Sequence, residues 1–446
     1  MRSKRVAIVG GGIAGLSAAY YLQKAGIGFE LFEQRRRFGG VISTERTPEG
    51  FIIEGGPDSF LTAKPAAIEL ARELGLGDQL LGSNDAQRKT YILLHNRLVA
   101  IPDGMQLMIP TRSWPVIASP LFSVATKLRI VREMFFPPAP LADGTDESVA
   151  SFVARHFGQE MVERLADPLL AGVYGGDSSR LSARAVLPMM VVSEAKHRSL
   201  VRGALRARAH TGSAQPLFTT FRGGMSQLVE TLALQLPQPA LWPKMGVASL
   251  ARSANGWDFA TEPFSHLVLA LPAPAAAALL WPLDPVLSAL LGKISYTSCI
   301  TVALAYPHLD LPPGFGFLVP RSENRRMIAC TFVHRKFDHR APQGTALLRI
   351  FITSGLDDSD EAILATVRAE LREILGITVE PLLARISRWR QAMPQYDVGH
   401  LDRVAQISQR VAQQPGLTLI GNAYGGVGVP DCIRSAKEAA AAIAAG

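Results

Sequence analysis

The chain has 446 residues, of which 48% are hydrophobic and 19% charged, so it is long enough for two or three domains with large cores and is not a disordered protein. Its formal net charge of +8 favours anionic partners such as polycarboxylates or acidic membrane surfaces. Nucleic acid is a less favoured partner, because the sequence has no basic segment interleaved with aromatic residues. Three widely separated cysteines, Cys299, Cys330 and Cys432, predict a reducing compartment with neither a disulfide framework nor a metal site.

The first 33 residues have the pattern of a nucleotide-binding unit. Residues 6–9 form an apolar run typical of a buried parallel strand, and a helix is expected over residues 16–24. A second strand over 29–32 ends at Glu33, whose carboxylate would accept hydrogen bonds from both hydroxyls of an adenosine ribose. Between strand and helix lies the pattern G-x-G-x-x-G, made by Gly10, Gly11, Gly12, Ile13, Ala14 and Gly15.

The glycines of this pattern each have a physical reason. Gly10 permits a tight turn, Gly12 lets a pyrophosphate approach the backbone, and Gly15 lets the helix pack closely on the strand. The helix N-terminus would then face the pyrophosphate with its free N–H groups. We therefore predict a bound dinucleotide.

Three arginines, Arg35, Arg36 and Arg37, follow Glu33 directly and could bind the extra phosphate of an NADP-type ribose. Glu33 would repel that phosphate. We favour an unphosphorylated adenosine and expect most of this basic run to be solvated.

Elements further along the chain follow from the hydrophobic pattern. We expect glycine pairs at 39–40 and 55–56 to allow close approach of a ligand, a helical segment over 62–82, a hairpin over 91–101, and mostly helices over 115–210. A helix is expected after the glycine pair at 223–224, short strands over 247–271 with a turn at Asn255-Gly256, strands at 296–306, 328–333 and 346–353, and a helix over 360–375.

Two stretches bear on partners. The apolar run 267–283 is too short for a membrane span and is interrupted by three prolines, so it predicts a strand, a turn and an Ala-rich helix. Arg198, Arg202 and Arg206 are four residues apart and are expected to share one helix face. No apolar signal-peptide region precedes the first strand, so we expect a cytoplasmic protein.

The C-terminal region predicts a buried strand over 417–420, a glycine-rich loop over 421–428 and an Ala-rich helix. A second helix N-terminus suits a flavin, because the reduced ring carries negative charge that a helix terminus stabilises. No second G-x-G-x-x-G pattern is present, so no separate NAD(P)H domain is expected. The substrate would then supply the electrons, and oxygen or a quinone would accept them.

These residues together resemble the oxygen-dependent, FAD-containing porphyrinogen oxidases of haem biosynthesis, which lie within the flavin amine oxidase group. The glycine pattern and the run Glu33, Arg37, Gly39, Gly40 belong to the wider group. Five blocks in the same order are similar to the porphyrinogen oxidases, in particular to their soluble bacterial branch: IIEGGPDSFL, IPDGMQLMIPTR, SEAKHRSL, RWRQAMPQYDVGH and GVGVPDCI.

The resemblance implies one non-covalent FAD per chain. The implied contacts, beyond the glycine pattern, are Glu33, Gln34, Arg37, Gly39, Gly40, Gly56, Pro57, Asp58, Ser59, the main chain of Val247, Trp389, Val427, Gly428 and Val429. It also implies a mixed α/β fold with an interleaved Rossmann-type domain. We expect this FAD domain to comprise residues 1–85, 216–271 and 385–446, with a helical substrate- or membrane-facing subdomain over 86–215 and a substrate-binding sheet over 272–384.

The implied activity is oxidation of a porphyrinogen to the porphyrin with O2, producing H2O2. We favour coproporphyrinogen III over protoporphyrinogen IX because of the bacterial blocks and the basic balance, with Lys89, Arg198 and Arg202 as candidates to bind substrate carboxylates. Plant and animal relatives carry a substrate-binding arginine where this chain has Thr90, so that contact is not transferred. The reaction requires no side-chain nucleophile or strong general base, and no nucleophile–base or paired-carboxylate pattern is visible, so the sequence leaves the catalytic residues unassigned.

Other functions remain open at this point. A flavin amine oxidase shares the scaffold, although its C-terminal aromatic pair is missing here, and a carotenoid-type desaturase shares it too. A non-enzymatic escort protein could keep the fold without the flavin. Peripheral membrane contact and contact with other enzymes of the haem pathway are further expectations.

Overall fold

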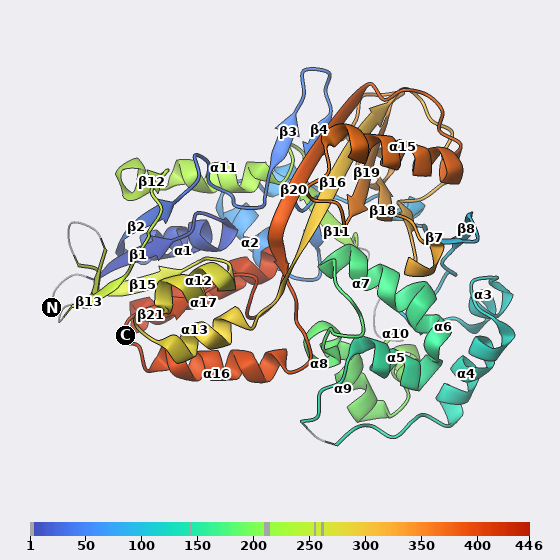
Figure 1. Ribbon diagram of the computed structural model, residues 1–446, viewed down its shortest axis with the longest axis horizontal. Helices are drawn as coiled ribbons and strands as arrows, with labels where there is room; N and C mark the ends of the chain where they lie inside the picture. The colour runs from blue at the N-terminus through green and yellow to red at the C-terminus, as the bar shows by residue number, and fades with distance from the viewer. Residues whose placement is uncertain (1–3, 143, 209–214, 254–255, 260–262) are drawn as a thin grey trace. The chain divides into compact units, whose positions relative to one another are not determined.

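The computed structural model describes residues 4–142, 144–208, 215–253, 256–259 and 263–446, which form a mixed α/β protein (Figure 1). The chain divides into two compact units. Unit 1 consists of Met1–Ser83, Pro216–Ser295 and Asp402–Gly446, and unit 2 consists of Asn84–Gln215 and Tyr296–Leu401. The predicted mixed α/β class is confirmed.

Unit 1 is built on a five-stranded parallel sheet. Its strand order is β12 (Leu241–Pro243), β2 (Gly28–Glu33), β1 (Arg5–Val9), β15 (His266–Leu269) and β21 (Leu417–Leu419). The central strand β1 is shielded on both faces, since Val6, Ala7 and Ile8 are all fully buried. Such strands are nearly continuous in apolar residues, which is why this one is evident from sequence. Three distant segments of the chain thus share one sheet.

Helices cover one face of this sheet. α1 (Ile13–Lys24) and α17 (Val429–Ala445) lie side by side (Figure 1) and share a core with α2 (Ala66–Glu73) and α11 (Ser226–Gln235). The other elements of unit 1 are α12 (Ala273–Leu280), α13 (Pro285–Gly292), α16 (His400–Ala412), β3 (Thr44–Arg46), β4 (Ile52–Glu54), β13 (Ala251–Ser253), β14 (Gly256–Asp258), and a three-stranded sheet of β5 (Phe60–Leu61), β11 (Phe218–Phe221) and β6 (Leu80–Gly82). The first two residues of α16 fall within unit 2.

Unit 2 combines a seven-stranded sheet with a group of helices. The strand order is β20 (Leu383–Pro394), β16 (Tyr296–Tyr306), β19 (Ala346–Ile352), β18 (Met327–Phe332), β17 (Gly316–Leu318), β7 (Thr90–Leu94) and β8 (Arg97–Ala100). The strands are antiparallel except for the pair β17 and β7. Helix α15 (Asp360–Leu375) packs on one face through Ile363, Val367 and Leu371.

The helical group of unit 2 has its own hydrophobic core. It contains α3 (Ser113–Ala118), α4 (Val124–Phe135), α5 (Val149–Phe157), α6 (Gln159–Met161), the π-helical turn Val162–Ala166, α7 (Asp167–Tyr174), α8 (Ala183–Val186), α9 (Pro188–His197) and α10 (Leu200–Arg208). Short strands β9 (Met105–Gln106) and β10 (Ile109–Pro110) precede it, and α14 (Val333–Lys336) follows β18. The expectation of mostly helical structure over 115–210 is confirmed for the described residues.

Two local predictions are wrong. The helix expected over 62–82 ends at Glu73, because Gly75 takes a left-handed conformation (φ +75°) and residues 80–82 pair with β11 instead. The arginines Arg198 and Arg202 do not share a helix. Arg198 has φ 64° between α9 and α10, and the Ser199 hydroxyl accepts the amide of Arg202 at 3.1 Å, so that it caps a new helix.

Other predictions agree with the structure. The run 267–283 forms a strand, a turn and helix α12, and helix α15 has the predicted bounds. Asn255 of the expected turn lies outside the described residues. Across the described ranges, no helix has the length and apolar character needed to span a membrane.

The units differ from the expected domain limits in three places. Residues 84–85, expected in the FAD domain, begin unit 2. Residues 272–295, expected in the substrate-binding sheet, form α12 and α13 within unit 1. Residues 385–401, expected in the FAD domain, belong to unit 2, because β20 pairs with β16 along most of its length. The functional assignment of each segment stays a prediction.

Candidate functional site

The loops that leave the parallel strands of unit 1 share one edge of the sheet. All five strands run in the same direction, so their carboxyl ends are neighbours. In open α/β sheets, ligands bind at this edge. The expected nucleotide-binding segments after β1, β2, β12 and β21 all begin there.

The glycine-rich loop after β1 combines close packing with open space. A Cβ atom at Gly15 would overlap the carbonyl oxygen of Gly10, and one at Gly10 (φ +107°) would overlap that of Ala270. A Cβ at Gly12 would find only the Cα of Gly40, at 3.9 Å. The backbone at Gly12 is therefore open to a ligand, while Gly10 and Gly15 are required for packing.

Helix α1 begins directly after this loop. Gly12 is its N-cap and no side chain caps the helix, so its first-turn amides are available to an anion. The loop is held in place by Glu33, which is buried at the end of β2. Its Oε2 accepts the amide of Gly11 at 2.7 Å and its Oε1 accepts the amide of Arg35 at 2.8 Å.

The segment before Val247 lies beside the end of β2. The amide of Met245 donates to the carbonyl of Glu33 at 2.9 Å, and the amide of Lys244 donates to that of Arg35 at 2.9 Å. A Cβ at Gly246 would lie 3.3 Å from the Cβ of Gln34. The structure thus brings residues 244–246, immediately before Val247, next to Glu33 and Gln34.

Gly39 and Gly40 lie against the first glycine loop. The amide of Gly39 donates to the carbonyl of Gly11 at 2.8 Å. Arg37 closes this turn, since its guanidinium donates to the carbonyls of Gly40 and Ile42, both at 2.8 Å. A Cβ at Gly56 would overlap the carbonyl of Val41, so the second glycine pair packs on the same turn.

The N-terminus of α17 is tied to the segment that follows Gly56. Asp431, in the first turn, accepts the amide of Gly428 at 3.1 Å and the ammonium of Lys64 at 2.6 Å. Nearby in the chain, the carbonyl of Asp58 accepts the hydroxyl of Thr220 at 2.8 Å. Sequence reasoning missed Lys64, because a single lysine in a loop carries no spacing signal.

The buried thiol of Cys432 belongs to the core of α1 and α17, as expected for a packing residue. Burial, together with the neighbouring carboxylate of Asp431, raises its pKa to about 12. The thiol therefore stays protonated at neutral pH and is a poor nucleophile.

Some predicted residues lie in unit 2. Trp389 is on β20, where it pairs with Cys299 of β16. Thr90 is the first residue of β7, directly after Lys89, and it pairs with Gly316. The structure assigns these residues to the other unit from the glycine loops, and their part in a site stays a prediction.

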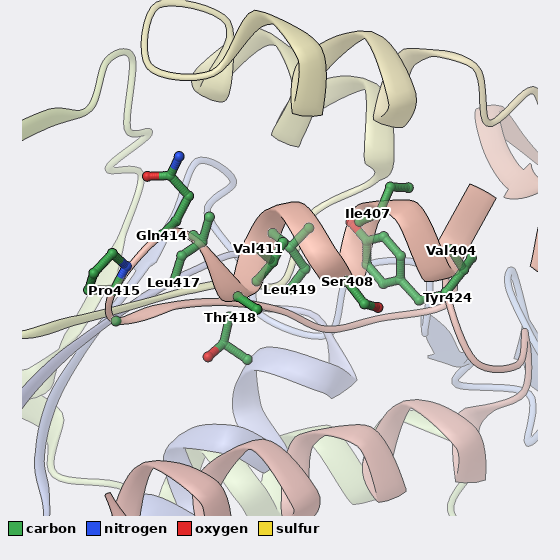
Figure 2. A pocket seen from close by; sticks show the side chains of 12 residues that line it. Val404, Ile407, Ser408, Val411, Gln414, Pro415, Leu417, Thr418, Leu419 and Tyr424 are labelled. Atoms are coloured by element: carbon green, nitrogen blue, oxygen red, sulfur yellow. The ribbon is translucent and has the colours of Figure 1, made fainter. Parts of the chain in front are cut away.

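A pocket of about 440 Å³ lies between α16 and the edge strand β21. Figure 2 shows apolar side chains of α16 and β21 in it, with Val411 close to Leu419 and Ile407 close to Tyr424. None of the predicted cofactor contacts lines this pocket. A smaller one of about 260 Å³ is lined by Arg37 and Phe38 together with residues of α11.

Comparison with known proteins agrees with this arrangement. The model of the family described as flavin containing amine oxidoreductase matches residues 13–444. A coproporphyrinogen III oxidase of Bacillus subtilis (strain 168) is 35% identical over 98% of this chain and 97% of its own, and one of Propionibacterium freudenreichii is 34% identical over 97% and 89%.

A solved structure is similar over the whole chain. It is a protein of Exiguobacterium sp. 255-15, named as a candidate protoporphyrinogen oxidase, which is 32% identical with a TM-score of 0.89 and covers 100% of this chain and 99% of its own. The protein is an oxidoreductase whose family carries a flavin. The chain belongs to the flavin-containing amine oxidoreductases, and within them to the porphyrinogen oxidases.

Proposed function

We propose that the protein is an FAD-dependent oxidase that converts coproporphyrinogen III to coproporphyrin III with O2 as electron acceptor. The observation that carries the proposal is the full-length similarity, at 34–35% identity, to two bacterial proteins named coproporphyrinogen III oxidase. The glycine loops and helix N-termini of unit 1 supply a site of the expected chemistry.

FAD fits the carboxyl edge of the sheet in unit 1. The open backbone at Gly12 and the uncapped amides of α1 suit the pyrophosphate. The carboxylate of Glu33 accepts two amides in this structure, and its remaining lone pairs can accept ribose hydroxyls. The main chain at Gly246, directly before Val247, lies beside Gln34. The edge of the adenine ring would pair with the main chain of Val247. We assign Gly56–Ser59 and Val427–Val429 to the same cofactor on the family resemblance.

Bound FAD would supply the chemistry of hydride acceptance, and a porphyrinogen would lose its six hydrogens in three such two-electron steps. The contribution of the protein is placement rather than a reactive side chain. The hydrogen bonds of Arg37 and Glu33 fix the glycine loops. The N-terminus of α17 would place partial positive charge near the reduced flavin ring, which is anionic. The buried thiol of Cys432 has a pKa of about 12, which supports non-covalent binding.

The experiment that tests the substrate is a comparison of kcat/KM for coproporphyrinogen III and protoporphyrinogen IX, followed under air by porphyrin fluorescence. We expect the ratio to favour coproporphyrinogen III. A tenfold preference for protoporphyrinogen IX, about 1.4 kcal/mol of transition-state discrimination, would contradict the proposed substrate. The absence of fluorescent product from both would contradict the proposed activity.

Acid precipitation tests the cofactor. Non-covalent FAD should be released into the supernatant when the protein precipitates. Treatment of that supernatant with phosphodiesterase should then release AMP from the FAD. Colour retained in the pellet would show a covalent link, and a supernatant without AMP would indicate FMN. A purified protein without flavin absorption would favour the escort alternative.

We also propose that unit 2 contacts acidic membranes through α3 and α4. Four apolar residues of α4 are exposed, and their spacing places them on one helix face: Val124, Leu128, Val131 and Phe135. We call these four residues the apolar stripe of α4. Trp114 of α3 is 75% exposed. Such a patch is unusual on a soluble surface. Lys127, Arg129 and Arg132 lie on the same helix, and a basic helix with an apolar face suits a surface of anionic lipid. The cytoplasmic location stays a prediction.

A further inference from the structure

A buried cluster of charged side chains joins four helices of unit 2. The imidazole of His156, on α5, lies between two carboxylates: Nδ1 is 3.1 Å from Oε1 of Glu133 on α4, and Nε2 is 3.0 Å from Oε1 of Glu194 on α9. The side chains of His156 and Glu133 are fully shielded from solvent, and that of Glu194 is 7% exposed. A buried ionisable cluster is costly unless its members are paired, so its protonation state matters.

Both carboxylates are held in their ionised form by other donors. Glu133 accepts the amide of Leu200 at 2.6 Å, the hydroxyl of Ser199 at 2.8 Å and the amide of Val201 at 3.3 Å, all at the N-terminus of α10. Oε1 of Glu194 accepts the guanidinium of Arg155 at 2.6 Å. Ionised carboxylates only accept hydrogen bonds. Both nitrogens of His156 must therefore donate, which requires the imidazolium form.

The charges around the cluster favour this form. Arg155 also binds Glu147 at 2.5 Å, so three carboxylates surround two cations, and the partial positive end of α10 faces Glu133. Glu160 of α6 and Arg164 of the following π-helical turn pair with each other at 2.8 Å, and they contact Ser123 and Leu121 at the other end of α4. Arg184 of α8 donates to the carbonyl of Gly144, and the rings of Phe152 and Phe157 complete the surroundings of the imidazole.

We propose that His156 is a proton-dependent clamp: as an imidazolium it fastens α4 to α5 and α9, and on deprotonation it loosens α4 from these two helices, while the bonds from α10 to Glu133 remain. Without the proton, one ring nitrogen would present a lone pair to a carboxylate oxygen, and only one cation would remain in the cluster against three carboxylates. Helix α4 is the element that responds, because Glu133 is its buried anchor. The opposite face of α4 carries the exposed apolar stripe.

The pH range follows from the directions of the pKa shifts. Burial lowers the pKa of His156, but the hydrogen bonds that its ring donates to Glu133 and Glu194 outweigh burial and raise the pKa above 6.5. A raised pKa means that the stabilisation is complete below about pH 6.5 and is lost as the pH rises through the folded-state value. Burial raises the pKa of both glutamates, but the His156 contact and their other donors outweigh it and lower the net value below 4.5. Their stabilisation is lost only in acid.

Hydrogen exchange of the full-length protein between pH 6 and 9, followed by mass spectrometry, tests the clamp. After division by the intrinsic base-catalysed rate, peptides of α4 should lose protection above pH 6.5 by up to about tenfold per pH unit, since opening releases one proton. His156→Gln should show lower protection at pH 6 and no such slope. His308→Gln, at an exposed position of the same unit, is the matched control and should behave as the unchanged protein.

A second pair of measurements keeps the proposal testable if His156→Gln fails to fold. Glu194→Gln keeps the shape of one partner but removes its charge, so the loss of α4 protection should move to lower pH. Nitrogen NMR of labelled histidine reports the protonation of His156 directly, and we expect both ring nitrogens to stay protonated to higher pH in the folded protein than in protein unfolded by urea. A His156 ring that loses its proton at the same or lower pH in the folded protein than in urea, an unchanged slope in His156→Gln, or an unshifted loss of protection in Glu194→Gln would refute the clamp.

Discussion

Glu33 binds the glycine loop that it is expected to serve, since its Oε2 accepts the amide of Gly11 at 2.7 Å. The acid at the end of β2 therefore has a structural role as well as the proposed contact with a ribose. The carboxylate fixes the position of the loop before any nucleotide binds, which lowers the entropy lost on binding.

Replacement of Glu33 should affect both stability and cofactor content. Glu33→Gln has a single acceptor oxygen, so one of the amides of Gly11 and Arg35 loses its partner at a buried position. We expect a loss of about 1–3 kcal/mol in the free energy of unfolding, together with a lower flavin content. Urea unfolding and flavin absorption measure the two effects. Glu438→Gln, in an exposed pair with Arg434, is the control and should change stability by less than about 1 kcal/mol.

Gly12 and Gly15 should respond differently to substitution. Gly12→Val should fold, because its Cβ would point into open space, but should lose most of its flavin because the side chain occupies the place of the pyrophosphate. Gly15→Ala should fail to fold well, since its Cβ overlaps the carbonyl of Gly10. Circular dichroism and the flavin-to-protein ratio separate these outcomes. Gly292→Ala, with no atom within 4 Å of the added Cβ, is a neutral control.

The thiol of Cys432 should resist modification in the folded protein. Its burial and its pKa of about 12 leave a negligible thiolate fraction at pH 8. Mass spectrometry after treatment with a thiol reagent should find Cys432 unmodified in native protein and modified in urea. Rapid labelling of Cys432 under native conditions would contradict the packing of α17 against α1.

The ion pair between the buried Asp284 and the partly exposed Arg410 should make stability depend on pH. Burial raises the pKa of Asp284, but the guanidinium of Arg410 and the amide of Leu287 outweigh burial and lower it. The stabilisation is therefore present above about pH 4 and disappears as the pH falls through the lowered folded-state value. Asp284→Asn should cost about 1–3 kcal/mol at pH 7. That deficit, measured by urea unfolding, should shrink towards pH 3; a constant deficit would contradict the ion pair.

The apolar stripe of α4 should bind anionic vesicles. Phosphatidylcholine vesicles that contain phosphatidylserine should sediment the protein, and salt should weaken the binding. The double change Leu128→Gln and Phe135→Gln should reduce binding at least tenfold, because each buried side chain contributes about 1.5–3 kcal/mol. Leu234→Gln, at an 80% exposed position of α11, is the control. An equal loss of vesicle binding in the Leu234→Gln control would contradict a specific contact through the apolar stripe of α4.

The sequence by itself was sufficient for the local elements. The strand, glycine loop, helix and acid of residues 5–33 follow from apolar runs and glycine spacing, and α15 follows from its period and its flanking residues. Both are short-range effects, because they depend on neighbours within a few residues. The family resemblance also needed only the order of blocks along the chain, and the comparisons confirm it.

The tertiary structure alone decided which distant residues meet. Residues 244–246 lie beside Glu33, Lys64 pairs with Asp431, and His156 lies between Glu133 and Glu194, although no sequence spacing connects these residues. The helix predicted over 62–82 ended early for the same reason, because residues 80–82 gain more from pairing with β11 than from continuing a helix. Strand pairing and burial of charge are long-range effects, and they override local propensity wherever the two conflict.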